Sequence, residues 1–246
     1  MKTKHLLRFL NRIAQYDADL EMIDVIRIAV RSGVLSGNSS GLIFDYVKPY
    51  KHRLLKKRTA SSHNRKLLVN HLKQSMYSSY IKDIYEDVLE YFNNIVSGVA
   101  RKGLDPDRLI GEHKIPIDAN TLIKCRTYDK VIEMVSAELI RCLENKRSTV
   151  KLIETLCGKL AITIDNETID NVLPYLEVRH LLVHRDGVAD DIFISKFPGI
   201  VLTDENEVRL DFDFIQKARS AIVSMVREFD RQVIANDLIN KNEMQI

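Results

Sequence analysis

Apolar residues recur at helical spacing along most of the chain. The longest run lies between Ser62 and Gly103, where an apolar stripe returns at every fourth residue. The stripe comprises Leu68, Leu72, Met76, Tyr80, Ile84, Val88, Phe92 and Val96. A basic last turn, Arg101 and Lys102, precedes Gly103, as is common where a helix ends. The pattern predicts one long helix over this stretch.

Further stretches show the same periodicity. Amphipathic helices are predicted within residues 118–145, 148–162, 166–187 and 212–237. Pro174 lies inside the third stretch, where we expect an interruption or a kink. Residues 192–211 differ, because β-branched and aromatic residues flank a polar turn, and this favours a loop or a small hairpin.

The N-terminal residues are predicted to form two or three short helices, one of them running from Asp17 to Gly33. A loop is expected from Ser36 to Gly41. Together these patterns predict an all-α fold. We expect an antiparallel helical bundle over residues 61–240, an N-terminal helical extension over residues 1–60, and a short loop or hairpin insertion near 192–211.

Composition agrees with a helical globular protein. The 246 residues are 45% hydrophobic and include only nine Gly and five Pro. The three cysteines have no metal-ligand spacing and are expected to be core thiols of a reducing compartment. The sequence shows neither a signal peptide nor a membrane span, so we expect a cytoplasmic protein without a membrane partner.

Charge is distributed unevenly, although the net charge is only +3. From Tyr46 to Lys82 there is no acidic residue. The basic residues of this stretch are Lys48, Lys51, Arg53, Lys56, Lys57, Arg58, Arg65, Lys66, Lys73 and Lys82. Two interpretations stay open: the stretch attracts phosphate chains, or it is a solvated face neutralised by an acidic surface such as residues 204–213. Under the first, Lys56, Lys57 and Arg58 are candidate RNA-binding residues.

The segment EVRHLLVHRDG, residues 177–187, concentrates the candidate chemistry. His180 and His184 lie four residues apart and share a helix face, a spacing that metal sites use. A metal site needs a third ligand, and only Glu177 or Asp190 is near in sequence. Alternatively, the cations favour the negative end of the helix dipole. A third interpretation is phosphodiester cleavage without a metal.

Such cleavage requires a group that removes the ribose 2′-OH proton, a group that protonates the departing 5′-oxygen, and a cation that holds the phosphate. Histidine suits the proton transfers because its pKa lies near neutrality. Arginine suits the phosphate because its planar guanidinium binds two oxygens. Residues five apart on a straight helix differ by about 140° in direction, so Arg179 and His184 would act together only at a helix end or across a dimer.

The string RHLLVH resembles the Arg-polar-x-x-x-His signature of the HEPN superfamily. Arg179 matches its arginine, His180 its polar second residue, and His184 its histidine. The signature sits late in a helical chain, before a loop and a final long helix, and the resemblance covers roughly residues 62–240. Among HEPN types, the chain looks most like the defence-associated, RiboL-PSP-like or MAE-like members. It departs from the toxins paired with a nucleotidyltransferase antitoxin, because Asp186 stands where their tyrosine would be.

The resemblance implies a homodimeric, metal-independent endoribonuclease with a composite cleft that leaves a 2′,3′-cyclic phosphate. His184 would be the acid/base, Arg179 would hold the scissile phosphate, and His180 would orient these two or bind RNA. Arg185 is a further candidate RNA-binding residue. No cofactor or metal is expected, and the partners would be RNA and an antitoxin or another defence protein. Two alternatives remain: a non-catalytic RNA-binding or interaction module, and a metal-dependent phosphodiesterase that uses His180 and His184.

Overall fold

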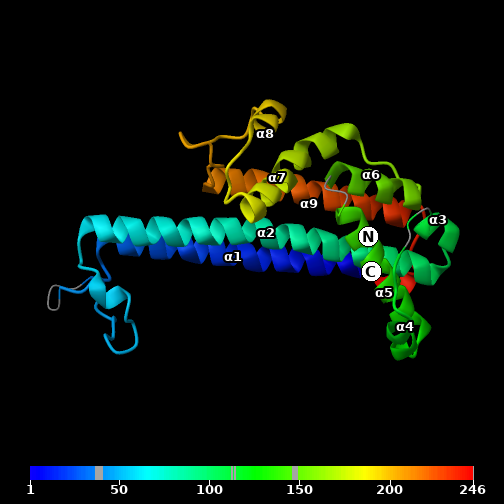
Figure 1. Cartoon of the computed structure of the whole chain (residues 1–246), viewed down its shortest axis with the longest axis horizontal. Coiled ribbons are helices and arrows are strands. Elements are labelled where there is room, and N and C mark those ends of the chain that lie inside the picture. Colours follow the sequence, from blue (N-terminus) through cyan, green and yellow to red (C-terminus); the bar gives the residue numbers. More distant parts are fainter. Residues whose placement is uncertain (37–40, 112, 114, 146–148, 246) are drawn as a thin grey trace. The chain divides into compact units, whose positions relative to one another are not determined.

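The computed structural model describes residues 1–36, 41–111, 113, 115–145 and 149–245, and the fold is all-α as predicted (Figure 1). The helices are α1 (Lys4–Ser32), α2 (Ser62–Lys102), α3 (Pro106–Ile110), α4 (Ala119–Cys125), α5 (Tyr128–Glu144), α6 (Thr149–Leu160), α7 (Asn166–His184), α8 (Asp191–Lys196) and α9 (Phe212–Ala235). Two short 3-10 helices are η1 (Leu55–Lys57) and η2 (Lys241–Glu243). Strands β1 (Lys2–Thr3) and β2 (Met244–Gln245) pair antiparallel.

The chain divides into two compact units. One contains Met1–Arg12 together with the chain from Ile81 onward, and the other contains Ile13–Tyr80. These boundaries differ from the one expected between residues 60 and 61, because α1 and α2 each contribute residues to both units.

The unit of residues 13–80 holds a helical pair and the connection between its members. Its part of α1 buries Ile13, Leu20, Ile23 and Val30. The two or three short N-terminal helices predicted from the sequence are one helix of 29 residues. The physical reason is that neither Gly nor Pro interrupts the chain before Gly33, where a positive φ of 80° ends the helix.

The other unit is built around α9 and the C-terminal part of α2. Helix α9 packs on α7, α7 on α6, and α6 on α5. The α9 face that the sequence pattern predicts is buried, with Ala218, Ile222, Met225 and Phe229 each at most 1% exposed. The rings of Phe92 and Phe229 lie 4.8 Å apart, so α2 and α9 share one aromatic core.

A buried carboxylate ties the first residues of the chain to α9. Asp230 is 1% exposed and accepts hydrogen bonds from the Thr3 hydroxyl and, at 3.1 Å, from the Thr3 backbone N–H. The Tyr91 hydroxyl donates to the same carboxylate at 3.1 Å. Burial raises the pKa of Tyr91 well above its usual value, so this hydroxyl remains a donor.

The insertion predicted near residues 192–211 contains a helix that the pattern did not indicate. Asp190 caps α8 by accepting a hydrogen bond from the Phe193 backbone N–H at 2.8 Å. The expected hairpin character is confined to the chain after α8, where Leu202 and Val208 form an isolated antiparallel bridge. Pro174 is accommodated inside α7, which is one continuous helix.

Candidate functional site

Helix α7 carries the histidine segment and ends where that segment ends. Asp165 caps its start by accepting from the Thr168 backbone N–H at 2.7 Å. Beyond His184 the chain leaves the helix through two positive φ angles, 51° at Asp186 and 89° at Gly187. The Gly187 N–H returns to the Leu181 carbonyl oxygen at 3.0 Å. This sharp exit leaves His184 in the last helical turn, with its side chain exposed.

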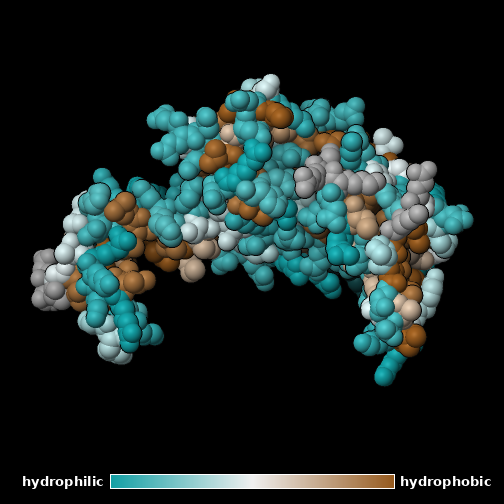
Figure 2. All heavy atoms as spheres, viewed as in Figure 1, coloured by the Kyte–Doolittle hydropathy of each residue, from teal (hydrophilic) through white to brown (hydrophobic). Residues whose placement is uncertain are grey.

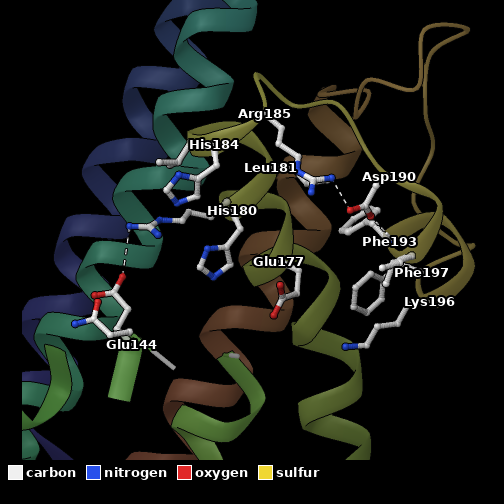
Figure 3. Close-up of a pocket in the computed structure, with 14 residues that line it drawn as sticks. Glu144, Glu177, His180, Leu181, His184, Arg185, Asp190, Phe193, Lys196 and Phe197 are labelled. Carbon is white, nitrogen blue, oxygen red and sulfur yellow. Dashed lines mark hydrogen bonds and ion pairs between the residues drawn. The ribbon is translucent and has the colours of Figure 1, made fainter. Parts of the chain in front are cut away.

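A pocket of about 820 Å³ lies beside the C-terminal half of α7. One wall is α7 itself, a second comes from α8, and the end of α5 contributes Glu144 and Asn145. In Figure 3 the imidazoles of α7 lie on one side of Glu177, and Phe193, Lys196 and Phe197, from α8 and the residue after it, lie on the other. The pocket therefore combines ionisable groups on one side with an aromatic and basic side opposite.

His180 and His184 form a stacked pair in this pocket. Their ring centroids lie 6.2 Å apart, and the ring planes differ by 14°. Glu177, one turn earlier on the same helix face, also lines the pocket. Figure 3 shows Glu177 and the two imidazoles on the pocket side of α7. The helical spacing of three and then four residues explains why these side chains gather on one face.

Burial distinguishes the two histidines. It lowers the pKa of His180 from its usual value, and the positive charges of Arg179 and His184 lower it further. The negative charges of Glu177 and Glu144 act in the opposite direction. His180 Nε2 lies 3.4 Å from the Thr149 hydroxyl. His180 is therefore biased towards the neutral imidazole, the form that accepts a proton.

Arg179 is held by two carboxylates and an aromatic ring. Its Nη2 lies 2.7 Å from Glu86 and 3.5 Å from Glu144, and its guanidinium carbon lies 4.5 Å from the Tyr85 ring centroid. Burial raises the pKa of Tyr85 to about 12, so this ring stays neutral beside the cation. The Arg179 Nε is buried and has no hydrogen-bond partner among the described residues. Arg179 is thus fixed in the pocket wall, with one nitrogen still able to donate.

Two further cations lie towards α8. Arg185, directly after His184, pairs with Asp190. Hydrogen bonds from the Phe193 amide and from Arg185 lower the pKa of Asp190, so this carboxylate stays ionised. Lys196 Nζ lies 5.1 Å from the Phe197 ring centroid. Arg185 is 53% exposed and therefore free to meet a ligand from solvent.

The structure brings the predicted residues Arg179, His180, His184 and Arg185 to one pocket. The remaining predicted residues, Lys56, Lys57 and Arg58, are exposed and belong to the unit of residues 13–80. The sequence did not reveal Tyr85, Glu86, Glu144, Thr149 and Lys196 as parts of the site. No signal could have found Glu86, which lies 93 residues from Arg179 along the chain.

In the described part of the chain, no three His, Cys, Asp or Glu side chains group closely enough to hold a metal ion. Neither Glu177 nor Asp190 completes a ligand set with the histidine pair, and Asp190 instead caps α8 and pairs with Arg185. The third ligand that the metal hypothesis needs is therefore not found among these residues.

No family model, no curated protein and no solved structure matches the chain. A search of the described helices finds none that is long and apolar enough to cross a membrane.

Proposed function

We propose that the chain is a metal-independent endoribonuclease of the HEPN type. The observation that carries this proposal is the gathering of the motif residues Arg179, His180, His184 and Arg185 on one pocket, with the two imidazoles stacked. Two proton-transfer groups and two cations beside one open cavity are the parts that phosphodiester cleavage requires.

The proposed reaction follows from the different environments of the two histidines. Neutral His180 accepts the proton of a ribose 2′-OH as the 2′-oxygen bonds to phosphorus. The bond between phosphorus and the 5′-oxygen then breaks, and His184 donates a proton to that leaving oxygen. The products are a 2′,3′-cyclic phosphate and a free 5′-hydroxyl.

Cations hold the phosphate during this step. Arg185 is open to solvent and reaches the phosphate by exchanging its contact with Asp190. Arg179 contributes by exchanging Glu86, the more exposed of its two carboxylate partners. Charge that builds on the phosphoryl oxygens in the transition state strengthens both contacts.

The assembly follows the HEPN pattern: a homodimer in which two copies of α7 form a composite cleft, with Lys56, Lys57 and Arg58 contacting RNA phosphates. The cellular role we propose is prokaryotic defence or toxin-like regulation, with an antitoxin or another defence protein as partner. This role rests on analogy with the superfamily.

The test is cleavage of total RNA in excess chelator by the wild type, His184→Ala and Arg179→Ala. Each variant should lose about 10²–10⁴-fold in rate, because a proton-transfer group or a phosphate contact is removed. His71→Ala, which removes an exposed helical histidine that does not line the pocket, should retain the wild-type rate. Wild-type cleavage that chelator abolishes, or no cleavage at all, would contradict the proposal.

A second candidate function is a non-catalytic RNA-binding module. It is favoured by the pairing of Arg179 with two carboxylates, which already satisfy its charge. This alternative expects RNA binding without cleavage. It also expects His184→Ala to bind RNA as the wild type does.

A further inference from the structure

Residues 41–61, in the connection between α1 and α2, present a set of cations without ion pairs to described residues. Six basic side chains within it have no ion pair in the part of the chain that the structure describes. They are Lys48, Lys51, Arg53, Lys56, Lys57 and Arg58. All six residues are exposed, and the sequence supplies no acid between Tyr46 and Lys82 to neutralise them locally. The surface therefore carries a concentrated positive potential that is available to a polyanion.

Large apolar and aromatic side chains stand among these cations. Tyr46 is 83% exposed, Tyr50 76% and Leu54 78%, and they follow one another at intervals of four residues. Figure 2 shows hydrophobic residues interspersed with hydrophilic ones at this end of the α1–α2 pair. Exposing two tyrosine rings to water forgoes the burial that aromatic side chains usually reach. Two exposed rings in the same segment as these cations are instead suited to stacking.

Backbone contacts within residues 41–61 accompany these exposed side chains. Ile43 is fully buried and Val47 is 7% exposed, so the segment has its own apolar anchor. His52 Nδ1 accepts the Lys48 backbone N–H at 3.0 Å, and η1 begins three residues later at Leu55. An isolated antiparallel bridge between Leu42 and Thr59 joins the two ends of residues 42–59. The rings and cations are therefore presented from an ordered backbone, which lowers the entropy cost of binding.

We propose that this connection is a binding surface for single-stranded RNA, in which Tyr46 and Tyr50 stack on unpaired bases while the surrounding cations contact the phosphates. Stacking on aromatic rings requires bases that are not already paired, which selects single strands over duplexes. Of the three large exposed side chains in this segment, Tyr46 and Tyr50 carry a polar hydroxyl and only Leu54 is aliphatic. This composition favours a nucleic acid over a lipid surface.

The inference extends the proposed function, with which it shares RNA as the ligand. It adds recognition of unpaired bases to the phosphate contacts of Lys56, Lys57 and Arg58. It does not depend on catalysis in the α7 pocket, so binding and cleavage can fail separately.

The experiment measures binding of a fluorescein-labelled single-stranded oligouridine by full-length His184→Ala, which keeps the probe intact. Tyr46→Ala with Tyr50→Ala removes two stacked bases and should weaken binding by roughly 30-fold or more. Replacing both with Phe should retain the affinity, whereas Leu should not, because Leu offers apolar area without a ring face. Tyr128→Ala removes a tyrosine that is 73% exposed elsewhere and is the matched control.

A second measurement tests the cations. Each single-strand phosphate contact contributes about 0.7 to the slope of log K against log salt, so replacing Lys56, Lys57 and Arg58 with Gln should reduce that slope by about 2. Unchanged binding in the tyrosine double variant, Leu as effective as Phe, or a duplex that binds as tightly as the single strand would each overturn the inference. So would tyrosine-dependent binding to phosphatidylserine vesicles without RNA binding. Circular dichroism of each variant reports whether its fold is retained.

Discussion

Glu86→Gln should increase the affinity of the α7 pocket for RNA. Glu86 binds the Arg179 guanidinium at 2.7 Å, where the proposed mechanism requires a phosphate oxygen. Glutamine keeps the shape and the hydrogen-bonding oxygen of the side chain but removes its charge. The scissile phosphate then competes with a neutral group, while Glu144 still holds the arginine from the side of α5.

The expected gain in RNA affinity follows from how exposed Arg179 and Glu86 are. The Arg179 side chain is 14% exposed, but that of Glu86 is 61% exposed, so solvent screens the pair from the glutamate side. An ion pair of this kind contributes about 0.2–1 kcal/mol, which corresponds to roughly 1.5- to 5-fold tighter binding when the competition is removed. The gain should shrink in high salt, because screening already weakens the competing contact.

The assay is RNA binding in the His184→Ala background, followed by single-turnover cleavage with His184 restored. Glu138→Gln is the matched control, since Glu138 pairs with Arg141 on α5 and does not line the pocket. Weaker binding in Glu86→Gln, or an equal gain in Glu138→Gln, would refute the idea that Glu86 and the phosphate compete for Arg179.

Three further changes test the site and the fold. Glu177→Gln removes a negative charge that raises the pKa of His180. The acidic limb of the pH profile of kcat/KM, where His180 becomes protonated, should therefore move to lower pH. An unchanged limb would show that another group controls it. Asp230→Ala leaves the Thr3 N–H, the Thr3 hydroxyl and the Tyr91 hydroxyl without their acceptor. It should lower the free energy of unfolding, measured by denaturant titration, by about 2–5 kcal/mol. A loss under ~1 kcal/mol would contradict the stabilising role of these hydrogen bonds. Gly187→Ala should destabilise the fold by about 1–2 kcal/mol, because a φ of 89° strains a residue with a Cβ. Gly158→Ala should instead stabilise it by about 0.5–1 kcal/mol, because Gly158 lies in α6 with open space for a Cβ. Thermal unfolding of the two variants tests these opposite signs.

Local periodicity was sufficient to predict the long helices. The predicted helix over 62–103 corresponds to α2, Ser62–Lys102, because an unbroken apolar stripe and a terminal glycine are both local signals. Helix α8 was missed because Ile192, Phe193 and Ile194 favour a strand, although Asp190 supplies a helix cap. Here capping and packing outweighed β propensity.

The site was predictable only where it lies on one helix. His180 and His184 are related by helical spacing, so their shared face could be derived from the sequence. The partners of Arg179 could not be derived, since Glu86 and Glu144 come from other helices and meet the arginine only through tertiary packing. The sequence therefore identified the two histidines on one helix face, but not the carboxylates that pair with Arg179.

The bond between Thr3 and Asp230 has a consequence for synthesis of the chain. These residues are 227 positions apart, so nearly the whole protein must be synthesised before Asp230, the acceptor of the Thr3 hydrogen bonds, is present. At translation rates of about 5–20 residues per second, that delay is roughly 10–50 s. Residues 13–80 form a compact unit of their own and should become protected first. Limited proteolysis of ribosome-stalled nascent chains ending near residue 120 should therefore cut before residue 13 and spare residues 13–80, and early protection of the first residues would argue against this order.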